Sequence, residues 1–417
     1  MTHFRKTALV LTFLLFASAA ISYACTSIIV SGKVTPDGRP LIWKNRDTDS
    51  DRNIMRHFPA QDGKYAYTAI VAEKTDDPES IWIGSNSEGF AIFNTLSYNI
   101  EWDKERDSQS NGVVMKMALE YCATVDDFEK MLEELPTPWD VDANFGVMDA
   151  QGNVAYFEVN SYEYYKYDVN DPSVAPDGYL VRSNFSFNGR PRIEGRGQCR
   201  YITAEALTRK ALESAGGITA DFVLNNHARC YANALMDLNL RGDENHAPKV
   251  KGWAFDNDFI TRKTTTSSVV ITGVKPGENP ELTTMWTIVS YPGTTVTMPV
   301  WASTGEEGIP VMLRGDENRQ SPLSQWGFAL KERVYNYDLD DTEENNRRYF
   351  NWELLFNGEG SGYLQKVLQL ESEILPPYRE ALKGWYAAGK IDRDELNQLN
   401  ASADTKVGEF YKANFDL

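Results

Sequence analysis

Histidine and cysteine, the residues that most often bind metals or act as nucleophiles, are both scarce in this chain. The 417 residues include four of each. The histidines beyond the N-terminal leader are His57, His227 and His246, and the cysteines show no spacing typical of a metal site. Zinc sites are built from three or four such ligands, so no metal site is predicted. No bound cofactor is expected either.

Positive charge is also in short supply. The chain has 42 basic and 60 acidic residues, and the leader (residues 1–24) holds two of the basic ones and none of the acidic ones. The remaining basic residues are scattered among carboxylates. Binding to a phosphate backbone requires clustered Lys and Arg, so nucleic acid is excluded as a partner.

Long apolar runs are missing beyond the N-terminus, and so are repeats and low-complexity linkers. A membrane-spanning helix needs about 20 consecutive apolar residues, and no later stretch has them. Residues 1–24 instead read as a signal peptide: Arg5 and Lys6 form a basic end, Leu9 to Ile21 an apolar stretch, and Ser22-Tyr23-Ala24 a cleavage site. The mature protein is therefore expected to be exported to the periplasm or the extracellular space, with no integral membrane segment.

Cleavage after Ala24 would leave Cys25 at the mature N-terminus with a free α-amine. A thiol attacks a carbonyl group only as the thiolate. An α-amine, with an unperturbed pKa of about 7.7 to 8.0, can take the thiol proton without any histidine. Cys25 is therefore the predicted nucleophile, and its own α-amine is the predicted base.

Two other interpretations of Cys25 stay open. Cys25 could be the acylated residue of a lipoprotein, although Ser22 and Tyr23 are poor lipoprotein-signal residues and no polar spacer follows. It could also be an ordinary structural cysteine. The other cysteines allow one disulfide among them or three buried thiols; they are Cys122, Cys199 and Cys230.

The hydrophobic pattern alternates between strands and helices. Strands are predicted at 25–30, 41–46, 65–72, 81–86, 90–95, 145–148, 154–159, 179–182, 267–274, 283–291 and 295–301, and helices at 112–120, 125–134, 200–214 and 219–237. This order favours an α+β fold with helices stacked outside packed antiparallel sheets.

From Ser321 the character changes to long amphipathic helices, including 362–374 and 377–388, with Pro376 and Pro377 at their junction. Length and pattern together predict one large catalytic domain over 25–320 and a helical C-terminal extension over 321–417 that packs on it.

Three stretches carry a resemblance to a known family. The first is Cys25-Thr26-Ser27-Ile28-Ile29-Val30, a turn at Pro36-Asp37-Gly38, and Lys44-Asn45-Arg46-Asp47. The second is Gly84-Ser85-Asn86-Ser87-Glu88-Gly89 followed by Asn94, and the third is Arg182-Ser183-Asn184-Phe185. The chain thereby resembles the N-terminal nucleophile (Ntn) cysteine hydrolases of the choloylglycine hydrolase and penicillin acyltransferase group. That group cleaves linear amide carbon–nitrogen bonds.

The resemblance implies a four-layer αββα sandwich and a role for each matched residue. Asp47 would accept a hydrogen bond from the Cys25 α-amine and orient it. Asn94 would donate a hydrogen bond to the oxyanion of the tetrahedral intermediate. Asn184 would hold the N-terminal amine or the scissile amide.

The cation of the motif is ambiguous. The family usually has arginine at the position of Lys44, and this chain has its arginine two residues later, at Arg46. Strand alternation places both side chains on one face, so either could lower the pKa of the thiol. Arg46 is favoured slightly because it adjoins Asp47. Arg262 is a weaker candidate for a late active-site arginine.

The predicted function is hydrolysis of a small-molecule linear amide through an acyl-thioester on Cys25, or transfer of the acyl group to an amine. An N-terminal cysteine dipeptidase is a second enzyme interpretation, because its opening motif is nearly the same. A ligand-binding lipoprotein tethered at Cys25, with no catalysis, is the alternative of another class.

Overall fold

The β-branched run after Cys25 forms the first strand of a six-stranded antiparallel sheet, which is called sheet one. The computed structural model describes residues 25–73, 81–100, 111–139, 141–214, 216–241, 252–256, 258–336 and 349–417. Sheet one has the strand order β10-β1-β2-β14-β15-β16, formed by Tyr179–Arg182, Thr26–Val30, Leu41–Asp47, Thr265–Thr272, Thr284–Ile288 and Met298–Trp301. The predicted leader and His246 lie outside the described residues.

A seven-stranded antiparallel sheet, called sheet two, lies against sheet one. Its strands follow chain order from β3 to β9: Asn53–Phe58, Tyr67–Ala72, Ile81–Asn86, Ala91–Leu96, Ala143–Met148, Val154–Val159 and Tyr164–Asp168. The facing strands touch, because β1 contacts β8 and β2 contacts β7. Aromatic and aliphatic side chains of both sheets share one buried core.

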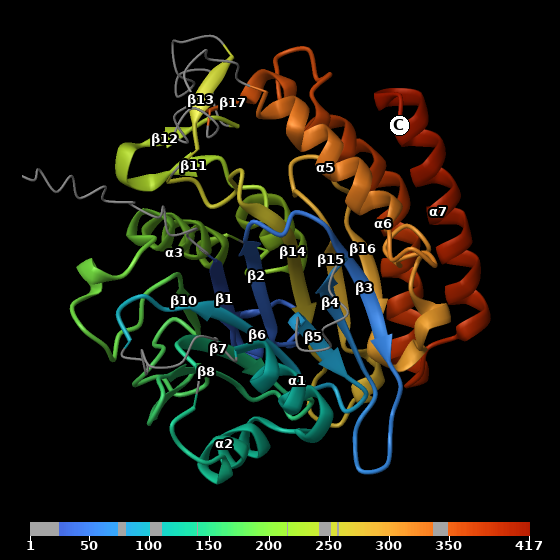
Figure 1. The fold of residues 1–417 in the computed structure, drawn as a ribbon. Helices are drawn as coiled ribbons and strands as arrows, with labels where there is room; N and C mark the ends of the chain where they lie inside the picture. Colours follow the sequence, from blue (N-terminus) through green and yellow to red (C-terminus); the bar gives the residue numbers. More distant parts are fainter. Residues whose placement is uncertain are drawn as a thin grey trace, which may run out of the picture.

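Helices cover the outer faces of both sheets (Figure 1). The α-helices are α1 to α7, over Asn111–Tyr121, Val125–Glu134, Gln198–Glu213, Ala220–Phe222, Pro322–Val334, Tyr363–Ala388 and Arg393–Phe415. Helix α1 contacts β5 and β6 of sheet two, and α3 contacts β1 and β10 of sheet one. The four layers confirm the predicted α+β fold with an αββα sandwich.

Short elements connect these layers. Two small sheets pair β11 with β12 (Ala232–Asn233 with Leu238–Asn239) and β13 with β17 (Trp253–Phe255 with Tyr349–Asn351). Single helical turns lie at Gly32–Val34, Arg192–Glu194, Val223–His227, Ala234–Met236, Pro280–Leu282, Ala302–Thr304, Glu306–Gly308 and Trp352–Leu354.

The C-terminal helices α5, α6 and α7 lie along the side of the molecule that carries β15 and β16 (Figure 1). The ring of Trp301 on β16 contacts Trp385 of α6 edge-on. Deeper in the interface, Arg229 and Glu371 of α6 form a buried ion pair with an N–O distance of 2.5 Å. These helices therefore share the core of the sandwich.

Most predicted elements are confirmed within a few residues, and two predictions are wrong. Helix α6 runs unbroken through Pro376 and Pro377, because buried residues on both sides of the prolines outweigh the lost backbone bonds. The helix predicted over 219–237 ends early, since Thr219 caps one short helix and Asn233 begins another turn.

Two further features bear on function. In the described part of the chain, no helix is long and apolar enough to cross a membrane, and no three His, Cys, Asp or Glu side chains gather as a metal site. All four cysteines are free thiols, so the structure contains no disulfide among Cys122, Cys199 and Cys230.

Candidate active site

Cys25 lies at the start of β1, on the face of sheet one that meets sheet two. The hydroxyl of Ser27 bonds the hydroxyl of Tyr156 on sheet two at 2.8 Å, while Thr26 points the other way, toward α3. Alternation along the strand therefore places Cys25 on the same inner face as Ser27. Cys25 is buried, with 6% of its surface exposed.

Arg200, in the first turn of α3, holds Cys25 from the opposite face. Its Nη1 donates to the carbonyl oxygen of Cys25 at 2.6 Å and to Oγ1 of Thr26 at 2.7 Å. Gly197 leaves room for this guanidinium, because a Cβ there would come within 2.2 Å of its Nη2. Burial, followed by the charge of Arg262, lowers the pKa of Arg200 to about 9. Arginine still keeps its charge at neutral pH, so a buried cation supports the start of β1.

Asn184, one of the predicted site residues, lies on the same arginine. Its Oδ1 accepts a hydrogen bond from Nη2 of Arg200 at 2.8 Å, and its Nδ2 donates to the carbonyl of Leu96 at 2.8 Å. Asn184 thus connects the end of β6 in sheet two with Arg200, the residue that holds Cys25. One Nδ2 hydrogen is left for another acceptor.

Lys44 and Asn94 meet between the two sheets. Nζ of Lys44 donates to Oδ1 of Asn94 at 3.0 Å and to the carbonyl of Trp82 at 3.2 Å. Trp82 and Asn94 each lie one residue beyond Ile83 and Phe93, the last residue pair of β5 and β6. Burial lowers the pKa of Lys44 to about 8; Arg46 acts in the same direction, and Cys25 and Asp47 oppose it. The ammonium of Lys44 therefore lies within electrostatic reach of the Cys25 thiol.

Arg46 makes a different set of contacts. Its guanidinium lies over the ring of Trp82, 3.9 Å from the centroid. Its Nη1 donates to Oδ1 of Asn53 at 2.7 Å and to Oγ1 of Thr266 at 3.1 Å. These contacts join β2 to β3 and β14. Both cations thus lie on the inner face of β2, and Lys44 is the one that contacts Asn94.

Asp47 is fully buried and has strong partners. Oδ2 accepts from Nε of Arg262 at 3.0 Å and pairs with its Nη2 at 3.0 Å, and Oδ1 accepts from Oγ1 of Thr265 at 2.6 Å. The charge of Asp47 opposes the lowering of the pKa of both Lys44 and Arg200. Asp47 and Cys25 therefore both lie within electrostatic reach of Lys44 and Arg200. The carboxylate oxygens of Asp47 retain lone pairs that can accept from a further donor.

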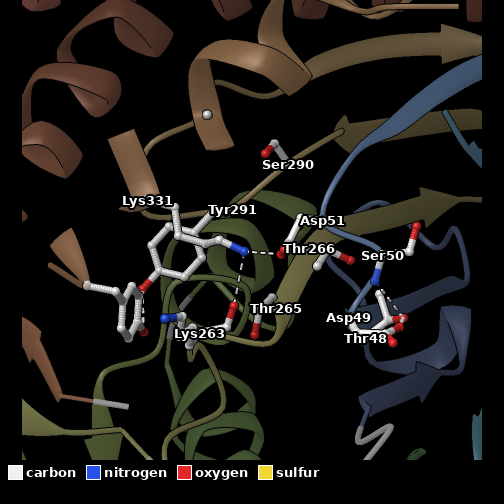
Figure 2. A network of polar contacts seen from close by, with 12 residues as sticks. Thr48, Asp49, Ser50, Asp51, Lys263, Thr265, Thr266, Ser290, Tyr291 and Lys331 are labelled. Atoms are coloured by element: carbon white, nitrogen blue, oxygen red, sulfur yellow. Dashed lines mark hydrogen bonds and ion pairs between the residues drawn. The ribbon is translucent and has the colours of Figure 1, made fainter. Parts of the chain in front are cut away.

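Figure 2 shows polar contacts of Lys331, on α5, with residues that follow Asp47 and Arg262 in the chain. Lys331 of α5 is buried, and its Nζ donates to the carboxylate of Asp51 and, at 3.2 Å, to the carbonyl of Lys263. The backbone N–H of Thr48 donates to the carbonyl of Thr264 at 2.8 Å. The residues directly after Asp47 and Arg262 are therefore held together, with α5 behind them.

The structure places the predicted residues in four sets of contacts. Cys25 and Asn184 share Arg200, Asn94 binds Lys44, Asp47 binds Arg262, and Arg46 binds Asn53. Sequence reasoning missed Arg200 because an arginine in the first turn of a helix looks like a surface residue. The signal that could have found it is Gly197, just before a helix that follows the Asn184 motif.

The chain also matches a known protein family over part of its length. The family model described as acyl-coenzyme A:6-aminopenicillanic acid acyl-transferase matches residues 34–193. The resemblance to the penicillin acyltransferase group is confirmed. The matched stretch includes Lys44, Asp47, Asn94 and Asn184, and it begins nine residues after Cys25. The chain is accordingly an enzyme of the class that acts on linear amide carbon–nitrogen bonds, which comprises amide hydrolases and acyltransferases.

Several solved structures match this chain at low sequence identity. A Caenorhabditis elegans N-acylethanolamine-hydrolyzing acid amidase ortholog has 15% identity and a TM-score of 0.38, covering 59% of this chain and 92% of that chain. Penicillin V acylase from Agrobacterium tumefaciens has 13% identity and a TM-score of 0.39, covering 67% and 86%. A variant of the conjugated bile acid hydrolase from Clostridium perfringens has 13% identity and a TM-score of 0.36, covering 64% and 92%. Comparison with the sequences of curated proteins gives no match.

Proposed function

We propose that this chain is an exported Ntn amidohydrolase that cleaves a small-molecule N-acyl amine or N-acyl amino acid through an acyl-thioester on Cys25. The proposal rests chiefly on one observation: Cys25 directly precedes β1, on the face shared by the two sheets, with Lys44 in electrostatic reach of its thiol. Removal of residues 1–24 would supply the α-amine that completes the site.

In the first half of the reaction, the α-amine of Cys25 takes the thiol proton and the thiolate attacks the carbonyl carbon of the amide. The tetrahedral oxyanion accepts a hydrogen bond from Nδ2 of Asn94, whose Oδ1 is already occupied by Lys44. The carbon–nitrogen bond then breaks, the α-ammonium returns its proton to the leaving nitrogen, and a thioester remains.

In the second half, the α-amine takes a proton from a water molecule, which attacks the thioester carbonyl. The thiolate leaves and the carboxylic acid is released; an amine in place of water would give acyl transfer instead. Lys44 would offset the negative charge on sulfur at both stages, and Asp47, which pairs with Arg262, would orient the α-ammonium.

The first experiment is the intact mass of the protein recovered from exporting cells, with its N-terminal residue identified by peptide mass spectrometry. A free Cys25 at the first position is expected. An acylated Cys25, or a chain that keeps residues 1–24, would remove the base and refute the proposal.

The second experiment is turnover of N-acyl amino acids, N-acyl amines and dipeptides by the processed protein and two thiol variants. Cys25→Ser should fold but lose nearly all turnover, whereas Cys199→Ser, which removes a partly exposed thiol on α3, should retain it. Turnover restricted to dipeptides would favour the dipeptidase. Wild-type rates in Cys25→Ser would exclude the thioester.

A further inference from the structure

The segment between β10 and α3 carries a net positive charge, whereas the chain as a whole is acidic. Residues 182–200 contain five arginines and one acidic residue, Glu194, in a chain with 60 acidic and 42 basic residues. The arginines are Arg182, Arg190, Arg192, Arg196 and Arg200. This segment also carries Asn184 and Arg200, the arginine that holds Cys25.

Three of the five arginines are engaged. Nε of Arg182 pairs with Glu158 at 2.8 Å, and Nε of Arg190 pairs with Glu194 at 2.7 Å. Arg200 binds the carbonyl of Cys25. Two acidic side chains in contact with this segment, Glu158 and Glu194, are thus already neutralised by arginine.

The other two guanidiniums stack on aromatic rings. Arg196 lies over Tyr98, 4.6 Å from the ring centroid, and Arg192 lies over Phe187 at 5.0 Å. Both arginines are exposed, and no carboxylate of the described residues forms an ion pair with either one. A ring beneath a guanidinium restricts its motion and leaves its edge N–H groups free, which favours two-point binding of a carboxylate.

A single residue, Asn184, links Arg196 to Arg200, which holds Cys25. Its backbone N–H donates to the carbonyl of Asn184 at 3.1 Å, and the Oδ1 of Asn184 accepts from Arg200. The ring that carries Arg196 belongs to Tyr98, whose N–H also donates to the Asn184 carbonyl, at 3.3 Å. The segment that carries the stacked guanidinium is thus linked through Asn184 to the arginine that holds Cys25.

We propose that Arg196, assisted by Arg192, forms an anion-binding rim that selects amide substrates carrying a carboxylate. This inference rests on the proposed function and adds to it the chemical class of the substrate. In an acidic protein that repels anions overall, a local excess of arginine directs a carboxylate to this edge of the site. Arg196 is thus a specificity-determining residue.

Three hexanoyl-type substrates test the proposal. N-Hexanoylglycine has a carboxylate on the amine half, N-hexanoylglycinamide is its neutral counterpart, and N-adipoylglycinamide has the carboxylate on the acyl half. The wild type should have a kcat/KM about 10-fold higher for one of the two anionic substrates than for the neutral one. Which one it prefers shows on which side of the scissile bond the rim lies.

Arg196→Gln should abolish most of that preference by raising KM for the anionic substrate, with kcat and the neutral substrate unaffected. Arg192→Gln should have a smaller effect in the same direction. Lys210→Gln, which removes one exposed charge farther along α3, is the matched control and should change nothing. The preference should also weaken as salt is added, because the guanidinium is exposed.

A binding measurement separates the two proposals. Calorimetric titration of the same three compounds into the Cys25→Ala protein should show tighter binding of the preferred anion, and Arg196→Gln in that background should remove the difference. Turnover of neutral amides with no preference for either anion would overturn the rim and leave the proposed function standing. Anion binding that depends on Arg196, without turnover of any amide, would support the rim and refute the hydrolase.

Discussion

Nζ of Lys44 on β2 and Oδ1 of Asn94 on β6 are 3.0 Å apart, which joins the two sheets at the candidate active site. Only an oxygen can accept from an ammonium, so this contact fixes which way the Asn94 amide is turned. Its Nδ2 then points away from Lys44 and makes no hydrogen bond to the described residues. In the proposed mechanism one lysine would serve two purposes, since it would offset the charge of the thiolate and present the amide donor.

The first prediction concerns this donor. Asn94→Asp keeps the shape of the side chain and its contact with Lys44 but removes the N–H groups. We expect kcat to fall about 100-fold to 1,000-fold, with little change in KM, because an oxyanion donor acts mainly in the transition state. Steady-state kinetics on the best amide substrate would measure this. Asn86→Asp is unsuitable as a control, because the Nδ2 of Asn86 donates to two buried carbonyls.

Asn153→Asp, at the β7–β8 turn, offers a matched control for the same chemical change away from the site. Among the described residues, Nδ2 of Asn153 donates only to Asp149, at 3.0 Å, so the variant should keep its kcat despite some loss of stability. Equal losses of kcat in the two variants would show that Asn94 has no special role.

The second prediction concerns pH. Burial lowers the pKa of Lys44 to about 8, so its ammonium is charged below that pH and neutral above it. The rate kcat/KM should therefore fall as the pH rises through about 8, when the thiolate loses its counter-charge. In Lys44→Arg the guanidinium stays charged, so the alkaline limb should move upward while the acidic limb, set by the α-amine, stays in place.

A pH–rate profile of the wild type and Lys44→Arg would decide this. Since the two side chains differ in geometry, kcat at pH 7 is expected to drop as well, and only the position of the alkaline limb tests the charge. An alkaline limb at the same pH in both proteins would show that some other group controls it.

Much of this site can be predicted from the sequence, because its residues occur at strand ends in contiguous motifs. Cys25, Lys44 and Asp47 come from two neighbouring strands whose pairing follows from the hairpin at Pro36-Asp37-Gly38. The choice between Lys44 and Arg46 does not follow, since both share a face and only the positions of Trp82 and Asn94 separate them.

Other parts depend on contacts between distant segments and have no local signal. Strand β3, Asn53–Phe58, was not predicted, because its first half is buried and its second half is partly exposed, without alternation. The five arginines within residues 182–200 do not stand out in a sequence whose basic residues are scattered among carboxylates. The role of Arg200 emerges only when α3 packs beneath β1.

The third prediction concerns Lys331, which we assign as a positioning residue. Lys331→Met would remove the bonds from α5 to Asp51 and to the carbonyl of Lys263 (Figure 2). The loop after Asp47 should then shift slightly, and kcat should fall about 10-fold with KM nearly unchanged. A purely structural role would lower the melting temperature without this split between kcat and KM.

Lys383→Met on α6 is the control for that variant. Lys383 and its partner Glu380 are both exposed, with side-chain exposures of 73% and 77%, so kcat and KM should match the wild type. If Lys331→Met matches it as well, the C-terminal helices do not position the site.

The fourth prediction concerns the buried pair that joins α6 to the sandwich. Nη1 and Nη2 of Arg229 donate to the two carboxylate oxygens of Glu371, which also accepts from the backbone N–H of Thr297. Glu371→Gln leaves Arg229 as an unpaired buried charge, so the free energy of unfolding should fall by about 3–5 kcal/mol. Replacing both residues, as Arg229→Met with Glu371→Leu, should cost less, because no lone charge stays buried.

Urea denaturation followed by both fluorescence and circular dichroism would measure these free energies. If residues 321–417 fold as part of the catalytic body, the two signals should coincide in one transition in the wild type and in both variants. An early transition that involves only the helical signal would show that the C-terminal helices unfold on their own. The loss in Glu371→Gln would then report docking of the extension rather than stability of the whole protein.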